Sequence, residues 1–343
     1  MNDRRDLFDA ALIPGMRDRL AEAYAQFRAS EADLIAALAP ASKKNEAVAY
    51  RDRDCPCCGT ASSNLVPVLA SHGLDLLTCP GCGLTYSKQT MHMATDANRY
   101  RASSLDIAAM RLRCSGPYLE LESARDRYYL DCLESARNGV APTLLEIGCG
   151  TGTLLAEASA RGWQCVGLEP GAAAVAVARE RGAGIAIEGY FPQDLPPEPD
   201  RYDAIAMLDV LEHFASPLDV LRQVHPLLTP KTGRLFVQVP NWDSPLVRLE
   251  GPASSIVVPG HWSYFTPASL PMLMARAHFR LEHIETVVSE CDRIAAFPLD
   301  AIERCITALR PGITMPEALP TAAWLHAHGL GYKLIATFVP LDG

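Results

Sequence analysis

The sequence predicts an α/β fold in which a mostly parallel, seven-stranded sheet carries helices on both faces. Short apolar runs alternate with helical segments between residues 143 and 239, a rhythm typical of a parallel, doubly wound sheet. A glycine-rich turn follows the first of these runs. Two more strand-like segments, 280–288 and 332–339, lack a matching crossover helix, so we expect them to pair antiparallel at the sheet edge.

The period of the apolar residues assigns the individual elements. We expect strands at 143–147, 165–168, 185–187, 202–208 and 234–239, and helices at 154–161, 172–181 and 218–228. Prolines between the last two strands predict an irregular helical insertion at about 290–330.

Four segments are expected along the chain. An apolar helical stripe from Met16 to Leu38 predicts an N-terminal helical segment, 1–50, suited to packing or oligomerisation. Residues 51–90 contain a cysteine cluster, 91–141 form a helical linker or lid, and 142–343 form the α/β domain.

Composition narrows the class of partner and the compartment. The net charge is −9, from 31 Lys and Arg against 40 Asp and Glu, which argues against a nucleic-acid partner held by its phosphates. No apolar run approaches the roughly 20 residues that cross a bilayer, and the charged N-terminus lacks the apolar core of a signal peptide. We therefore expect a cytoplasmic protein without a membrane partner, whose eleven cysteines form no disulfide framework.

Four of the cysteines have metal-ligand spacing. Cys55-Pro56-Cys57-Cys58-Gly59 and Cys79-Pro80-Gly81-Cys82-Gly83 are two C-P-x-C-G knuckles about twenty residues apart. Each knuckle turns both of its sulfurs toward one centre, so the pair predicts a zinc site made by Cys55, Cys58, Cys79 and Cys82. Four protein ligands leave no open position, which indicates a structural ion, and Cys57 is spare.

The glycine turn has the context of a nucleotide-type site. Glu146-Ile147-Gly148-Cys149-Gly150-Thr151-Gly152 lies between a strand and a helix, and Glu169 ends the next strand, where a Rossmann-like site places a carboxylate on ribose hydroxyls. Thr153 stands where a dinucleotide motif has its third glycine. Glu146 just before the turn would repel a pyrophosphate and attract a ligand ammonium group, which favours S-adenosylmethionine over NAD.

This turn resembles the first motif of class I S-adenosylmethionine-dependent methyltransferases. Asp209-Val210-Leu211-Glu212-His213 and 227–235 resemble their later motifs, and the likeness covers about 142–279. Pro240-Asn241 and the stretch 261–266 resemble a subgroup that includes ubiquinone-type O-methyltransferases and enzymes of sugar and natural-product pathways. The resemblance implies a cofactor site made of Glu146, Gly148, Cys149, Gly150, Gly152, Glu169, Pro170, Tyr190, Phe191 and Asp209.

Two histidines follow strand ends on the expected ligand side of the sheet. His213 is the candidate general base, and His261 and Tyr264 are candidate acceptor-site residues. The alternatives are a pocket-shaping role for His213 and a packed loop around His261.

The leading hypothesis is methyl transfer to oxygen or carbon of a small molecule, a sugar-nucleotide or a secondary metabolite. A zinc module before such a domain is similar to sugar C-methyltransferases, and also to certain ribosomal-RNA guanine methyltransferases. An RNA methyltransferase that grips its substrate with the zinc module, and a non-catalytic binding protein with a cofactor fold, are the alternatives. A homodimer stays open.

Overall fold

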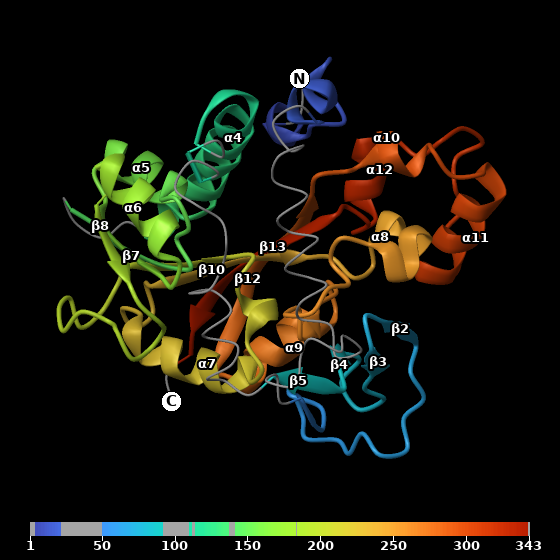
Figure 1. Ribbon diagram of the computed structural model, residues 1–343, viewed down its shortest axis with the longest axis horizontal. Helices are drawn as coiled ribbons and strands as arrows, with labels where there is room; N and C mark the ends of the chain where they lie inside the picture. Colours follow the sequence, from blue (N-terminus) through green and yellow to red (C-terminus); the bar gives the residue numbers. More distant parts are fainter. Residues whose placement is uncertain are drawn as a thin grey trace.

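The computed structural model describes residues 4–21, 50–91, 110–111, 114–136, 141–182 and 184–341 (Figure 1). Most of the predicted N-terminal helix and much of the predicted 91–141 segment lie outside these residues. Among the described helices, none is long and apolar enough to span a bilayer.

The main sheet has seven strands in the order β12-β13-β10-β9-β6-β7-β8. Its strands are β6 (Thr143–Ile147), β7 (Gln164–Glu169), β8 (Ile185–Glu188), β9 (Ala204–Leu208), β10 (Arg234–Pro240), β12 (Phe279–Val287) and β13 (Lys333–Pro340). The five strands from β6 to β10 pair in parallel, and β13 is antiparallel to both β10 and β12. The predicted fold class and the antiparallel pair at the edge are confirmed.

Helices cover both faces of this sheet (Figure 1). They are α4 (Gly116–Cys132), α5 (Thr153–Ala160), α6 (Ala172–Glu180), α7 (Pro217–Val224), α8 (Pro245–Glu250), α9 (Ser269–Arg276), α10 (Cys291–Ile294), α11 (Leu299–Leu309) and α12 (Ala322–Ala327). Side chains of α4 and α5 share one core with Leu144 and Phe236, whereas those of α7 and α9 share another with Leu145 and Val237. Neighbouring strand residues thus alternate between two cores, as the period of a strand requires.

The helix predicted at 218–228 is shorter than expected. It ends as α7 at Val224 and continues as a 3-10 turn, His225–Leu227, because Pro226 has no N–H to donate to the helix. Further 3-10 turns occur at Arg4–Phe8, Glu134–Ala136, Leu211–His213 and Gly251–Ala253.

The cysteine-bearing segment forms a second sheet beside α9 (Figure 1). Its order is β11-β4-β3-β2, from β2 (Leu69–Ser71), β3 (Leu74–Thr78), β4 (Thr85–Ser87) and β11 (Ser263–Tyr264). A separate two-stranded ribbon joins β1 (Tyr50–Asp52) to β5 (Gln89–Met91). One strand of this small sheet, β11, therefore lies far along the chain from the other three strands.

Candidate active site

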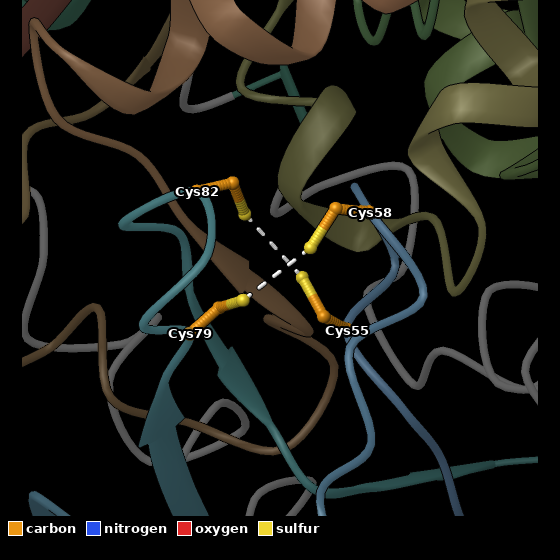
Figure 2. A group of neighbouring side chains, drawn as sticks. All are labelled: Cys55, Cys58, Cys79 and Cys82. Carbon is orange, nitrogen blue, oxygen red and sulfur yellow. Dashed lines mark hydrogen bonds between the residues drawn. The ribbon is translucent and has the colours of Figure 1, made fainter.

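The four predicted metal ligands come together. Figure 2 shows Cys55, Cys58, Cys79 and Cys82 pointing at one centre from two loops. The Sγ atoms of Cys55 and Cys82 are 3.5 Å apart, those of Cys58 and Cys79 are 3.4 Å apart, and all four lie within 4.8 Å of one another. A tetrahedral zinc with Zn–S bonds of about 2.3 Å separates its sulfurs by about 3.8 Å, so the cluster has the right size for zinc.

The two knuckles have the same local geometry. Gly59 N–H donates to Cys55 O (2.9 Å) and Gly83 N–H to Cys79 O (2.8 Å), each glycine with a positive φ. Burial raises the pKa of the Cys82 thiol to about 12, whereas at Cys58 burial is outweighed by hydrogen bonds with Thr60, which lower the pKa to about 6. Cys57 is buried and stays outside the group of four, as expected.

The three glycines of the turn have positive φ and different surroundings. A Cβ on Gly148 would lie 2.4 Å from Val210 Cγ2, and one on Gly152 would lie 3.0 Å from Ala178 Cβ. A Cβ on Gly150 would meet nothing within 4 Å. Gly148 and Gly152 therefore allow close packing, whereas Gly150 lines open space that a ligand can approach.

Buried carboxylates lie around this turn. Glu146 is 3% exposed and Asp126, on α4, is 2% exposed; in the described residues Glu146 Oε2 and Asp126 Oδ2 have no hydrogen-bond partner. Burial and the nearby Asp126 raise the pKa of Glu146, and burial with Glu122 raises that of Asp126 to about 8. A buried carboxylate oxygen without a partner is costly unless a cation or donor meets it, and the ammonium group of an amino acid fits between these two groups.

Glu169 connects the glycine turn to the start of α6. Its Oε2 accepts from Gly150 N–H (3.1 Å) and its Oε1 from Gly171 N–H (2.7 Å). Pro170 follows it, partly buried. The adjacent loop is held by Asp194, whose Oδ2 accepts from Tyr190 N–H at 2.8 Å, and Phe191 packs beside β7. These residues line the far side of the turn, and Cys149 is buried beneath it.

The carboxylate of Asp209 is already engaged. Lys333 Nζ lies 2.7 Å from both of its oxygens, and Gln238 Nε2 donates to Oδ2 at 3.0 Å. Tyr129 of α4 donates to Gln238 Oε1. Burial lowers the pKa of Lys333, but the Asp209 carboxylate outweighs this effect and raises it. Asp209 therefore joins three elements to the end of β9.

His213 and His261 are in ring contact, with centroids 4.5 Å apart. Nδ1 of His213 lies 2.8 Å from Gly260 O, and Nδ1 of His261 lies 2.9 Å from Ile256 O. A carbonyl oxygen only accepts, so each Nδ1 carries the hydrogen and Nε2 holds the lone pair of the neutral ring. The fixed tautomer is the one that a general base needs.

Glu212 completes this cluster. It is 1% exposed, and neither carboxylate oxygen has a hydrogen-bond partner in the described part of the chain. Burial, with a smaller contribution from Asp209, raises the pKa of Glu212. Glu212, His213 and His261 place donor atoms within 4.8 Å of one another, a spacing that suits proton transfer and could also hold a divalent ion.

Tyr264 is buried in β11 and packs on Trp242, with ring centroids 5.0 Å apart. Burial raises the pKa of its phenol, so the hydroxyl stays protonated at neutral pH. Its predicted place in the acceptor site stays a prediction.

Sequence reasoning missed several residues of the site. Asp126 is one acid in a charged helix, and no spacing distinguishes it. The sequence could have indicated Lys333, because a lysine at the start of an apolar strand needs a buried partner. Glu212 stood inside the motif that ends at His213, but it received no role.

Comparison with known proteins supports the methyltransferase resemblance over part of the chain. Residues 121–284, just under half of the chain, match the family model described as a methyltransferase domain. This matched segment contains the glycine turn, Glu169, His213, His261 and Tyr264.

Particular relatives are similar over part of their length. Ubiquinone biosynthesis O-methyltransferase of Pseudomonas paraeruginosa is 33% identical over 111 residues, covering 31% of this chain and 47% of that protein. The enzyme of the same name from Serratia proteamaculans is 37% identical over 105 residues, covering 29% of this chain and 43% of the relative. The chain thus spans a little under half the length of these relatives. Magnesium protoporphyrin IX methyltransferase from Synechocystis PCC 6803 is 13% identical, with a TM-score of 0.44, over 72% of this chain and 96% of that one.

Proposed function

We propose that the protein transfers a methyl group from S-adenosylmethionine to oxygen or carbon of a small molecule, a sugar-nucleotide or a secondary metabolite. The observation that carries the proposal is the pair His213 and His261, each held in the tautomer of a base. Gly148 packs on Val210, and Val210 precedes His213 by three residues. The segment that carries His213 is therefore next to the glycine turn. The relatives named as O-methyltransferases support transfer to oxygen.

The residues at the turn fit the cofactor. Glu146 and Asp126 would hold its ammonium group, and Glu169 its ribose hydroxyls. Gly150 leaves room for close approach, Tyr190, Phe191 and Pro170 would flank the adenine, and Cys149 fills the space under the turn. When bound, S-adenosylmethionine supplies an electrophilic methyl group on a sulfonium.

The chain's own residues then handle the acceptor proton. His213 Nε2 accepts a proton from a hydroxyl or an acidic C–H, while the Nδ1 hydrogen bond to Gly260 keeps the ring oriented. Burial, with a smaller contribution from Asp209, raises the pKa of Glu212 and so favours its neutral form beside the histidines. His261 and Tyr264 would position the acceptor. Asp209, which is bound by Lys333, would lie at the end of β9 between the cofactor residues and the histidines.

We also propose that zinc occupies the Cys55, Cys58, Cys79 and Cys82 cluster as a structural ion. The size of the cluster and the spacing of its sulfurs support this assignment.

Calorimetry tests the cofactor proposal. S-adenosylhomocysteine should bind the wild type, and NAD should not. Gly150→Val, which fills the open side of the turn, and Glu169→Ala should each weaken binding at least about tenfold, ~1.4 kcal/mol. Unchanged affinity in both variants, or tight NAD binding, would overturn the proposal.

A further inference from the structure

The zinc module and the histidine loop share one sheet. β11 pairs with β4 of the zinc module, with Ser263 opposite Tyr86 and Tyr264 opposite Thr85. His261 lies two residues before β11. The loop that carries His261 is therefore an edge extension of the module's own sheet.

Arg53, two residues before the first zinc ligand, binds this loop directly. All three of its guanidinium nitrogens donate to backbone carbonyls: Nε to Ser87 O at 2.9 Å, Nη1 to Ala215 O and Nη2 to Trp262 O. Ala215 follows His213 by two residues, and Trp262 follows His261 by one. One side chain thus joins the zinc module to both histidine-bearing loops.

Backbone hydrogen bonds complete the same junction. Ser87 N–H donates to Trp262 O at 3.0 Å, and Trp262 N–H donates to Glu212 O at 2.8 Å. Nδ1 of His213 then bonds Gly260 O in the facing loop. The chain of contacts runs from Arg53 through Trp262 to Glu212 and His213.

We infer that Arg53 is a positioning residue that fixes the His213 and His261 loops on the zinc module, so that the module sets the geometry of the acceptor side. Arginine suits this place because its planar fork presents separate donors in fixed directions, whereas a lysine offers one point charge. If zinc were bound by the four cysteines as thiolates, the site would carry a net charge of −2, and this charge would offset part of the cost of burying the Arg53 guanidinium. The catalytic consequence rests on the proposed function, but the positioning itself does not.

Amide hydrogen exchange tests the positioning without cofactor or acceptor. In Arg53→Met, the Trp262 and Ser87 amides should exchange at least 10-fold faster than in the wild type, and the His213 and His261 ring signals should shift in NMR spectra. Zinc should stay at one per chain. Arg51→Met is the matched control, because Arg51 is an exposed arginine on β1, two residues before Arg53, and it should leave both readouts unchanged.

The kinetic test compares kcat with the affinity for S-adenosylhomocysteine. In Arg53→Met, kcat should fall at least 10-fold while the affinity for S-adenosylhomocysteine stays within 2-fold. Unchanged exchange and unchanged ring signals in Arg53→Met would overturn the inference. If that variant does not fold, Arg53→Lys takes its place: exchange at least 3-fold faster supports the inference, and wild-type exchange overturns it. A wild type that binds no S-adenosylhomocysteine refutes the proposed function and leaves the exchange result standing.

Discussion

The glycine turn and the histidine junction lie side by side, but the chain builds them in opposite ways. The turn is local: Glu146, its three glycines and Glu169 lie on adjacent strand–helix units, and Glu169 closes it through two backbone N–H groups. The junction, made by Arg53, Trp262, Glu212, His213 and His261, brings together three segments far apart in sequence. The turn depends on its own strand–helix units, with Asp126 added from α4, whereas the junction needs the zinc module as well.

This difference predicts that the two halves of the site fail separately. Cofactor affinity should follow the turn, and turnover should follow the junction. The experiments below are ordered from the largest expected effect to the smallest.

Loss of zinc should have the largest effect. Cys55→Ser/Cys79→Ser should lose the ion, and structural zinc contributes on the order of 10 kcal/mol to folding of small modules. Turnover should then disappear, while the affinity for S-adenosylhomocysteine stays within about threefold. Metal analysis and calorimetry on the same sample check both parts. Stoichiometric zinc in the variant, or parallel loss of both functions, would break the comparison.

Variants of the two histidines should show which one is the general base and which one positions the acceptor. Loss of a general base costs about 10²–10⁴-fold in rate, ~3–5 kcal/mol. We expect His213→Gln to show this loss with normal cofactor binding, and His261→Gln to raise the KM for the acceptor more mildly. Single-turnover methyl transfer measures both. Turnover within a few-fold of wild type in both variants would exclude either as base. Inhibition of the wild type by EDTA, with zinc still retained at one per chain, would indicate a second metal held by Glu212, His213 and His261.

Alanine substitutions at Gly148 and Gly150 should lower the free energy of unfolding by different amounts. Alanine at Gly148 combines left-handed strain of ~1–2 kcal/mol with overpacking of ~1–3 kcal/mol, because its Cβ would lie 2.4 Å from Val210. Gly150→Ala carries only the strain. Urea unfolding should therefore show a loss of about 2–5 kcal/mol for Gly148→Ala and about 1–2 kcal/mol for Gly150→Ala. Equal losses would mean that Val210 moves aside freely.

The smallest effect is expected for Asp126, and it tests the contact proposed between this carboxylate and the ammonium group of the cofactor. Asp126→Asn should weaken S-adenosylhomocysteine binding about tenfold, ~1.4 kcal/mol, and leave binding of 5′-methylthioadenosine unchanged, because that compound has no ammonium group. Equal weakening for both ligands would argue against the assigned contact.

The pH dependence of binding and stability follows from Asp126. Its pKa of about 8 in the folded protein lies above its ordinary value of 3.8. Its neutral form is therefore favoured, and the contribution to stability is present at low pH and lost as pH rises toward 8. A bound ammonium favours the carboxylate, so affinity should rise from pH 6 to 8, by up to tenfold per unit. Asp126→Asn should flatten both trends, as calorimetry and unfolding across this range can measure.

The local parts of the molecule were predictable from the sequence, and the non-local parts were not. Strand rhythm and glycine spacing predicted the sheet, and paired C-x-x-C spacing predicted the cysteine cluster. Arg53 and Asp126 had no such pattern, because their partners are backbone carbonyls and a carboxylate set by tertiary packing. The predicted roles of His213 and His261 came from position alone, and their ring contact emerged only with the fold.

The place of β13 has a consequence for biosynthesis. β13 lies between β10 and β12, yet β12 precedes it in the chain, so during vectorial synthesis β12 leaves the ribosome before its partner exists. β13 can join the sheet only after both of its neighbours have been synthesised. Its first residue, Lys333, also binds the Asp209 carboxylate at the end of β9. The strand that is synthesised last therefore completes both the sheet and this ion pair.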